Sequence, residues 1–402
     1  MHCKMSHRFQ RFFLGLLLSA GTVTVSAQTS GFRAIQPPGS DAAYSAGVLA
    51  NGTLYVSGQG STAAGFSEQM NDGMRKLRAV LQAAGMDYPN VVWMNIYVTD
   101  EHNLPAMEDI YWNTIGPAPP ARTVLTVAAL PNGEMVEINC IAVAGEKKAV
   151  WPDGWPRGRH IDPPAVQAGE ILYLSAQGGK PGTDFSQETK QALENVSTIL
   201  NAAQMSMKNV LWVNPYMSEG GVYDVMGKVY RTYFEFGNTP GRGTIQVVGL
   251  PRGQHIVFSC IAGEDLSKRK AVRPRNMPPS PTASPGILYD DTLYLSAKDG
   301  FIPGQGLVTP LFDLQLRQSM RNLLDGLEEV DMDFSNVVFS TVYLRQMKDS
   351  EQMNELYNKF LKTPYPARTT LQQNLDVNNE AAEQISFIAV RRQPASTSEA
   401  SR

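Results

Sequence analysis

Three stretches of the chain show the same alternation of apolar and polar positions. Each begins with a short apolar strand that ends in a serine, LYVSGQG from Leu54, LYLSAQGG from Leu172 and LYLSAKDG from Leu293. A segment with apolar residues every three or four positions follows, the spacing of a helix with one buried face. The period is about 120 residues, the size of a small domain rather than of a solenoid unit. We therefore predict three copies of one domain.

The second half of the repeat also recurs. A strand that is apolar at nearly every residue starts near Asn90, Asn209 and Asn336, a pattern typical of burial on both faces. A shorter helix, a Pro-x-Arg turn and a last strand follow, the strand reading EINCIAV, VFSCIAG or QISFIAV. In the first copy, Asn51 and Gly52 mark a hairpin before the first helix. The predicted order is ββαβαββ, an α+β domain with helices on one face of a mixed sheet.

The predicted domains cover residues 31–148, 157–268 and 282–393, and proline-rich links join them. A sheet that is covered by helices on one face alone would leave its other apolar face exposed. Three copies avoid this if the sheets face inward around a pseudo-threefold axis and the helices lie outside. Such a chain closes its own ring, so we expect a monomer with internal trimer-like symmetry.

The two ends of the chain differ from the repeats. Residues 1–27 have the features of a signal peptide, with a basic start, an apolar run at 12–20 and a small-residue cleavage motif at 25–27. The apolar run is too short for a membrane span. We expect a periplasmic or secreted protein without membrane attachment after cleavage, and an uncleaved anchor is the alternative. The tail at 394–402 is of low complexity, which predicts disorder.

Composition and motifs argue against several classes of function. The formal net charge is −3, so the chain lacks the basic excess on which nucleic-acid binding relies. The histidines show no metal-ligand spacing, and neither a phosphate loop nor a nucleophile elbow is present, so we expect no metal and no cofactor. Cys140 and Cys260 occupy equivalent positions in two copies. Two small buried residues are expected there, with a disulfide as the alternative.

The strand-end serine, the PAR turn and the EI-x-x-IAV ending resemble the RidA/YjgF family of enamine and imine deaminases. The resemblance covers all three copies, roughly residues 32–393. It implies the chorismate-mutase-like domain fold. Because members of that family form homotrimers with ligand clefts between subunits, it also implies such a trimer made from a single chain.

The resemblance implies roles for two kinds of residue. In the family, an arginine after Pro-Ala holds the substrate carboxylate, and a glutamate in the last strand handles the water or proton. The arginine falls on Arg122, Arg242 and Arg368. The glutamate falls on Glu137 in the first copy, and Phe258 and Gln384 replace it in the others. By this resemblance, Arg122 and Glu137 are the predicted catalytic residues.

The other pocket residues of the family are distributed unevenly among the copies. The strand-end serine is Ser57, Ser175 and Ser296. The tyrosine before the first hairpin is Tyr44 in the first copy, whereas the third has Ala283 and the second has a shorter loop without a tyrosine. The asparagine of the second helix is Asn354 in the third copy, against Glu108 and Gly227. The position that is often a thiol is Val124, Thr244 and Thr370. No copy has the full set.

The chemistry suits these residue types. Hydrolysis of a 2-imino acid needs a fixed cation for the carboxylate, and the planar fork of arginine supplies it. It also needs a group that moves protons, and a partly buried carboxyl with a raised pKa can do so. We therefore expect an exported hydrolase that converts small imines or enamines to keto acid and ammonia, with at most one or two competent sites.

Two alternatives remain open at this point. The first is a small-carboxylate-binding module without catalysis, because two copies keep the arginine and lack the glutamate. The second is an endoribonuclease, a label that the family also carries, and both export and the slightly acidic chain argue against it. Glu137 discriminates between the first alternative and an enzyme, because only an enzyme needs it.

Overall fold

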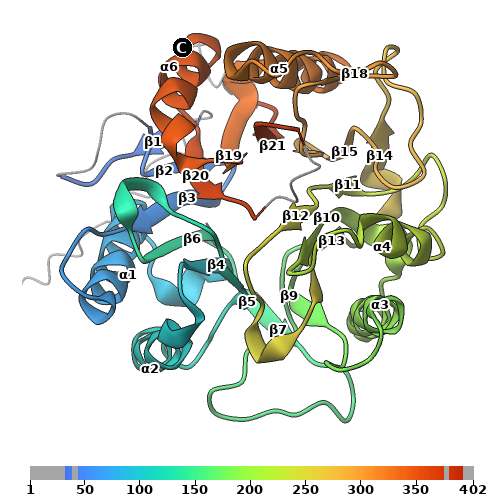
Figure 1. The fold of residues 1–402 in the computed structure, drawn as a ribbon. Helices are drawn as coiled ribbons and strands as arrows, with labels where there is room; N and C mark the ends of the chain where they lie inside the picture. Colours follow the sequence, from blue (N-terminus) through green and yellow to red (C-terminus); the bar gives the residue numbers. More distant parts are fainter. Residues whose placement is uncertain (1–31, 39–43, 375–379, 393–402) are drawn as a thin grey trace, which may run out of the picture.

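The structure is a computed structural model that describes residues 32–38, 44–374 and 380–392. Three domains of one topology surround a central axis, with the helices outside and the sheets facing inward (Figure 1). This arrangement confirms the predicted α+β class and the pseudo-trimer. The predicted signal peptide and the tail lie outside the described residues. In the described part of the chain, no helix is both long and apolar enough to cross a membrane.

Domain 1 shows the common plan. Its elements are β1 (Arg33–Ile35), β2 (Gly47–Ala50), β3 (Thr53–Gly60), α1 (Phe66–Ala83), β4 (Val91–Val98), α2 (Leu104–Thr114), β5 (Ala121–Thr126) and β6 (Val136–Val143). The strand order is β1-β2-β3-β6-β4-β5, in which β5 runs parallel to β4 and the other neighbours are antiparallel. The edge strand β1 is an addition to the predicted ββαβαββ order.

Domains 2 and 3 repeat the plan with local changes. Domain 2 consists of β7 (Lys147–Val150), β8 (Ala165–Ala168), β9 (Ile171–Gly178), α3 (Phe185–Ala202), β10 (Val210–Met217), α4 (Tyr223–Tyr230), β11 (Gly241–Arg242), β12 (Ile245–Gln246) and β13 (Ile256–Gly263). Domain 3 consists of β14 (Arg269–Val272), β15 (Gly286–Tyr289), β16 (Thr292–Leu295), β17 (Phe301–Ile302), β18 (Gly306–Leu307), α5 (Phe312–Glu328), β19 (Val337–Leu344), α6 (Ser350–Phe360), β20 (Ala367–Gln372) and β21 (Glu383–Val390). The counterpart of β5 is split into β11 and β12 after the sequence Gly-Arg-Gly.

Short 3₁₀ turns connect several of these elements. They span Tyr88–Asn90, Glu101–Asn103, Pro131–Gly133, Met207–Asn209, Pro251–Gly253, Leu266–Lys268, Phe334–Asn336 and Met347–Asp349. The turns before β4, β10 and β19 carry a reciprocal capping box, which fixes where each of these strands begins.

Each domain has its own core between sheet and helices. In α1, Met70, Met74, Leu77 and Leu81 are buried on the face toward the sheet, as their spacing predicts. The opposite faces of the three sheets pack against one another in a shared core around the axis. This core contains Trp93 among aliphatic and aromatic residues of all three domains. No sheet face in the described residues is therefore left open over a large apolar area.

The shared core has aromatic contacts between domains. Trp93 of domain 1 meets Trp212 of domain 2 edge to face, with ring centroids 6.3 Å apart. Tyr55 of domain 1 lies 6.2 Å from Phe339 of domain 3. Because such pairs add to the free energy gained by burial alone, they stabilise the ring of domains.

Polar bridges between domains lie in the same buried layer. Thr123 bonds to Ser259 at 3.1 Å, and Asn139 of domain 1 donates to Thr369 of domain 3 at 2.7 Å. At the third interface, Gly243 stands where the other two domains have threonine. The hydroxyl of Ser386 consequently has no hydrogen-bond partner among the described residues. The three interfaces are thus unequal even at their centre.

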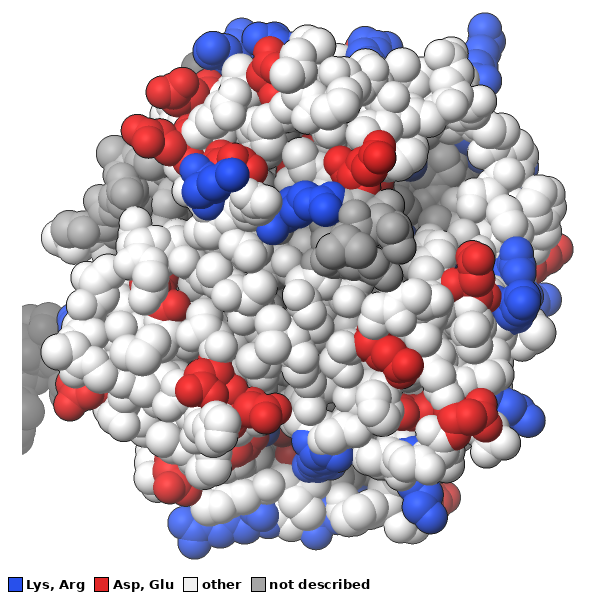
Figure 2. Space-filling view, viewed as in Figure 1, with Lys and Arg blue, Asp and Glu red and all other residues white. Residues whose placement is uncertain are grey.

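Two sequence-based expectations concern surface charge and cysteine. On the face shown in Figure 2, Lys and Arg side chains are interspersed with Asp and Glu rather than gathered in one patch. Cys140 and Cys260 are both buried free thiols, so the alternative of a disulfide is wrong.

A buried carboxyl in domain 3 gives a prediction about stability. Glu383 is 0% exposed in β21, where Val136 and Ile256 stand in the other domains. Burial raises the pKa of Glu383 to about 8; a hydrogen bond from Ser319 offsets part of that rise and Asp299 adds to it. In the unfolded chain the carboxyl titrates near about 4.3, so the folded state favours the protonated form.

This carboxyl therefore destabilises the fold progressively as pH rises from about 4.3 to about 8, by roughly 1.4 kcal/mol for each pKa unit. Glu383→Gln is expected to raise the Tm at pH 8 by several degrees and to leave it nearly unchanged at pH 4. Thermal unfolding across this range measures the effect, with the exposed Glu380→Gln as the matched control. Parallel Tm curves for wild type and Glu383→Gln would contradict the prediction.

Candidate active site

The strand-end serine of each domain holds the arginine-bearing strand of another. The serine hydroxyl accepts the backbone N–H of the arginine in the pairs Ser175 with Arg122 (2.9 Å), Ser296 with Arg242 (2.8 Å) and Ser57 with Arg368 (2.8 Å). These contacts define three places between domains, which we name cleft 1–2, interface 2–3 and cleft 3–1 by the domains that form them. Each combines the arginine of one domain with the serine and last strand of the next.

This arrangement separates the two predicted catalytic residues. Arg122 lies in cleft 1–2, whereas Glu137 lies in cleft 3–1 with Arg368. The structure therefore does not bring Arg122 and Glu137 together. The reason is the ring itself, because the copy that supplies the arginine to a cleft never supplies its last strand.

Strand register corrects the predicted equivalence of Phe258. The strand partners Tyr97, Tyr216 and Tyr343 are equivalent, and they face Glu137, Val257 and Gln384 respectively. Val257 is thus the counterpart of Glu137 in domain 2. Phe258 is buried in the core beneath the helices of that domain.

The structure also corrects the position before the first hairpin in domain 2. Each strand-end serine donates to a backbone carbonyl, that of Ser45, Pro163 or Ser284. The residues directly before these carbonyls are Tyr44, Asp162 and Ala283. Domain 2 therefore has Asp162 where domain 1 has its tyrosine, thirteen positions before the serine in both domains, so the expectation of a shorter loop is wrong.

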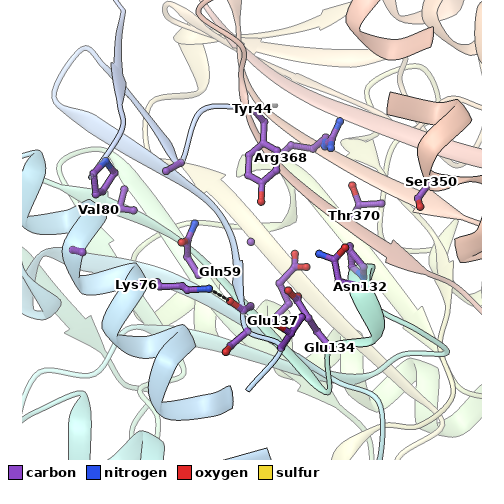
Figure 3. A pocket seen from close by; sticks show the side chains of 18 of the residues that line it. Tyr44, Gln59, Lys76, Val80, Asn132, Glu134, Glu137, Ser350, Arg368 and Thr370 are labelled. Atoms are coloured by element: carbon purple, nitrogen blue, oxygen red, sulfur yellow. Dashed lines mark hydrogen bonds between the residues drawn. The ribbon is translucent and has the colours of Figure 1, made fainter. Parts of the chain in front are cut away.

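Cleft 3–1 is a cavity of about 620 Å³ that is lined by four of the nine predicted site residues (Figure 3). Tyr44 and Glu137 of domain 1 line it together with Arg368 and Asn354 of domain 3. Ser57 lies behind them and fixes the backbone of Arg368. The cavity thus assembles from two domains a set that no single copy contains.

The guanidinium of Arg368 lies between two aromatic rings. Its central carbon is 5.3 Å from the ring centroid of Tyr44 and 5.2 Å from that of Tyr357. Within the described residues Arg368 forms no ion pair, whereas Arg122 forms two. Aromatic rings stabilise a cation without accepting its N–H donors, so those donors can still bind a carboxylate.

Glu137 is nearly buried, at 4% exposed. Burial raises its pKa well above the usual range, Glu134 raises it further, and Arg368 acts in the opposite direction. A carboxyl whose pKa is raised in this way is suited to both giving and taking a proton.

The neighbouring glycine makes room for this carboxyl. A Cβ on Gly58 would lie 1.7 Å from Oε1 of Glu137. The residues that follow the other strand-end serines are Ala176 and Ala297, at the two places without a glutamate. Gly58 is therefore a site residue that sequence reasoning missed, although its pairing with Glu137 could have been noticed.

Two polar atoms at cleft 3–1 lack partners. Oγ1 of Thr370 and Oδ1 of Asn354 are buried, and neither has a hydrogen-bond partner in the described part of the chain. Thr370 follows Arg368 by two positions on β20, so both side chains lie on one face of the strand. Unpaired buried polar groups are costly, so a substrate with donors and acceptors would satisfy them. Sequence reasoning had noted Thr370 without assigning it to the site.

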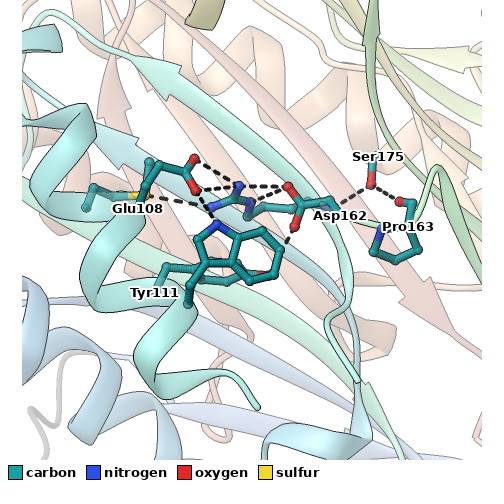
Figure 4. Close-up of polar contacts among 8 residues, drawn as sticks. Glu108, Tyr111, Asp162, Pro163 and Ser175 are labelled. Atoms are coloured by element: carbon teal, nitrogen blue, oxygen red, sulfur yellow. Dashed lines mark hydrogen bonds and ion pairs between the residues drawn. The ribbon is translucent and has the colours of Figure 1, made fainter. Parts of the chain in front are cut away.

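Cleft 1–2 has a different composition, although it also contains a cavity, of about 410 Å³. Arg122 donates from Nε and Nη2 to Asp162 at 2.9 and 2.7 Å, and from Nη2 to Glu108 at 2.9 Å (Figure 4). Burial alone would lower the pKa of Arg122, but Asp162, Tyr111 and Glu108 outweigh it and raise the pKa. In this cleft the guanidinium of Arg122 is thus already paired with two carboxylates of the chain itself.

Interface 2–3 offers hydroxyls to its arginine instead. Arg242 donates from Nη2 to the hydroxyl of Tyr223 and, at 3.2 Å, to that of Thr282. Its Nη1 is buried with no partner among the described residues. Gln384 takes the place of Glu137 here, so this interface lacks the proton-transferring carboxyl.

The fit between Gly58 and Glu137 gives a second prediction. Gly58→Ala is expected to destabilise the protein by about 1–3 kcal/mol, because the new methyl group overpacks a buried carboxyl. The double variant Gly58→Ala with Glu137→Val reproduces the Ala176 and Val257 pair of domain 2 and is expected to recover most of that loss. Urea unfolding of the two single variants and the double variant measures the coupling. Additive effects would show that the two positions do not depend on each other.

Comparison with known proteins agrees with this architecture. The family model described as Endoribonuclease L-PSP matches residues 34–144, 159–263 and 276–390. A 2-iminobutanoate/2-iminopropanoate deaminase of Rattus norvegicus is 35% identical over 116 residues, which are 27% of this chain and 85% of the relative. The deaminase of the same description from Homo sapiens is 32% identical over 116 residues, with the same two shares.

A solved structure resembles more than one domain. A chorismatase crystal structure covers 75% of this chain and 93% of its own chain, with a TM-score of 0.54 and 12% identity. At that identity the likeness shows the fold alone. On the three matches of the family model and the similarity to its deaminases, the chain belongs to the endoribonuclease L-PSP family, which is the RidA/YjgF family, and carries three of its domains.

Proposed function

We propose that the protein hydrolyses small 2-imino acids, or their enamine tautomers, to 2-oxo acids and ammonia in cleft 3–1. The observation that carries this proposal is the meeting of Arg368 and Glu137 in one cavity. Relatives that are 2-iminobutanoate/2-iminopropanoate deaminases support the reaction class. In this proposal Arg122 does not act on the substrate, because it lies in another cleft.

The substrate carboxylate binds to Arg368. Cleft 1–2 supports this step, because Arg122, at the equivalent position, already binds the carboxylate of Asp162 through hydrogen bonds from Nε and Nη2. Arg368 is 7% exposed, so a carboxylate there is largely shielded from water and the attraction is strengthened. The guanidinium of Arg368 lies over the rings of Tyr44 and Tyr357, which stabilise its charge.

Glu137 moves the protons. In its protonated form it donates to the imine nitrogen, and as a carboxylate it takes a proton from the water that attacks C2. It then returns that proton to the nitrogen of the carbinolamine, so that the C–N bond breaks and ammonia leaves. The hydroxyl proton of the carbinolamine finally restores protonated Glu137 as the C2 carbonyl forms. The net reaction consumes one water and yields one 2-oxo acid and one ammonia.

A second candidate function is the binding of small carboxylates without turnover. Interface 2–3 favours it, because the buried Nη1 of Arg242 has no hydrogen-bond partner in the described part of the chain and Gln384 stands in the place of the glutamate. The two functions are compatible in one chain, and substitution of Glu137 separates them.

The third prediction tests the proposed reaction. Glu137→Gln keeps the size of the side chain and removes its titration, so kcat is expected to fall about 10²–10⁴-fold. Binding of 2-oxobutanoate is expected to stay near the wild-type value. Arg368→Ala removes a charged partner and is expected to weaken that binding by roughly 1.5–3 kcal/mol. The assay generates 2-iminobutanoate in situ with an amino acid oxidase, and calorimetry measures the binding of 2-oxobutanoate.

Matched arginines provide the controls. Arg122→Ala and Arg242→Ala change the equivalent residue at the other two interfaces, so turnover is expected to stay within a small factor of wild type. Full activity of Glu137→Gln would contradict the proposed reaction. Loss of activity in Arg122→Ala but not in Arg368→Ala would assign the reaction to the other cleft.

We also propose that the protein is exported and that the mature chain is a monomer. The sequence of residues 1–27 supports export, and the closed ring of three domains supports a monomer. The fourth prediction is a mature N-terminus near Gln28 and a solution mass of about 40 kDa. N-terminal sequencing of the protein from the periplasm or medium, with light scattering, measures both. A stable species of about three times that mass would contradict the monomer.

A further inference from the structure

Cleft 1–2 differs from cleft 3–1 in the occupant of its arginine. We propose that cleft 1–2 is a gated binding site for small carboxylates, which Asp162 of the chain itself occupies as an internal ligand. This site is distinct from cleft 3–1. The proposal concerns carboxylate binding in cleft 1–2 and does not depend on imine hydrolysis.

Asp162 takes the place that Tyr44 has in cleft 3–1. Both residues directly precede the carbonyl that accepts the strand-end serine, so the backbone presents them to their arginines from the same place. Arg368 lies over the ring of Tyr44, whereas Asp162 accepts hydrogen bonds from Nε and Nη2 along one edge of Arg122. The edge is where a substrate carboxylate would bind, so Asp162 competes with such a ligand directly.

The segment that carries Asp162 is the link between domains 1 and 2. We name residues 151–164 the strap. His160 of the strap stacks on Trp112 with ring centroids 5.3 Å apart, and Tyr111 donates to Asp162 at 3.4 Å. The side chain of Asp162 is still 23% exposed, against 6% for that of Arg122. The internal ligand therefore lies at the accessible side of the arginine, where an external carboxylate would arrive.

A cavity for the rest of a ligand is present beside this ion pair. It measures about 410 Å³, and the strap contributes Trp151 and Trp155 to its wall. Its lining includes Val124, Ala176 and Val257, the counterparts of Thr370, Gly58 and Glu137 in cleft 3–1. Valine at two of these positions removes the polar groups of Thr370 and Glu137, although Gln177, Asn195, Arg252 and Gln254 also line the cavity. The wall at these positions can accept the apolar side chain of a small carboxylate, and no carboxyl stands at the place of Glu137.

The internal ligand lowers the apparent affinity of the site. A group on a short tether has an effective concentration of about millimolar or more, so an external carboxylate must compete with it. The apparent Kd for an external carboxylate equals the intrinsic Kd divided by the fraction of molecules in which Asp162 has released Arg122. Glu108 on Nη2 keeps the arginine charge paired when the strap releases, so opening does not leave an isolated buried cation.

The fifth prediction tests this gate in the full chain. The double variant Arg242→Ala with Arg368→Ala removes the other two arginines and serves as the background. Calorimetry of this variant with 4-methyl-2-oxopentanoate as the probe is expected to detect little binding. Adding Asp162→Ala is expected to create one binding site with at least tenfold higher affinity. Adding Arg122→Ala to that variant is expected to abolish the new site. Asp153→Ala, at an exposed aspartate of the same strap, is the matched control and is expected to change nothing.

The outcomes separate this inference from the proposed function. If Asp162→Ala creates no binding while wild-type cleft 3–1 binds 2-oxobutanoate, the ion pair is purely structural and the inference is wrong. If wild type hydrolyses no imine but Asp162→Ala gains an Arg122-dependent site, the inference stands without the deaminase. Should Asp162→Ala unfold, Asp162→Asn keeps the shape and removes the charge. A failure of this folded variant to gain any affinity would equally overturn the proposal.

Discussion

The burial of three sheet faces against one another is the constraint on which the rest of the structure depends. Each sheet has helices on one side alone, so its other apolar face needs a partner. The ring of three domains supplies that partner, and the contact between Trp93 and Trp212 lies in the resulting core. Ring closure also brings the strand-end serine of one domain against the arginine strand of the next. Every candidate site is composite for this reason.

A single chain allows the three interfaces to differ. In a trimer of identical subunits every substitution would appear in all clefts, whereas here each copy has its own residues. Cleft 3–1 combines Glu137 and Gly58 with an arginine that forms no ion pair within the described residues. Cleft 1–2 has Asp162 on its arginine and Val257 in the place of Glu137. One fold thus presents one cavity suited to proton transfer and another that is closed by its own carboxylate.

The difference between cleft 3–1 and cleft 1–2 depends on both charge and burial. Burial raises the pKa of Glu137, and no hydroxyl or backbone group of the described residues offsets that rise, whereas Arg122 keeps its charge because two carboxylates surround it. A buried arginine without such partners would be costly, and in cleft 3–1 two tyrosine faces take over part of that task. The residue before the serine-bound carbonyl therefore decides whether the arginine is blocked or available.

The sequence by itself determined the repeat, the α+β class and the inward-facing sheets, because periodicity of apolar residues reports burial directly. It also named four of the residues that line cleft 3–1, namely Tyr44, Glu137, Asn354 and Arg368. Only the tertiary structure decided which of them meet. The partnership of Glu137 with Arg368 rather than Arg122, and the position of Asp162 on Arg122, depend on the order of domains around the ring. That order joins residues more than a hundred positions apart, which no local pattern along the chain records.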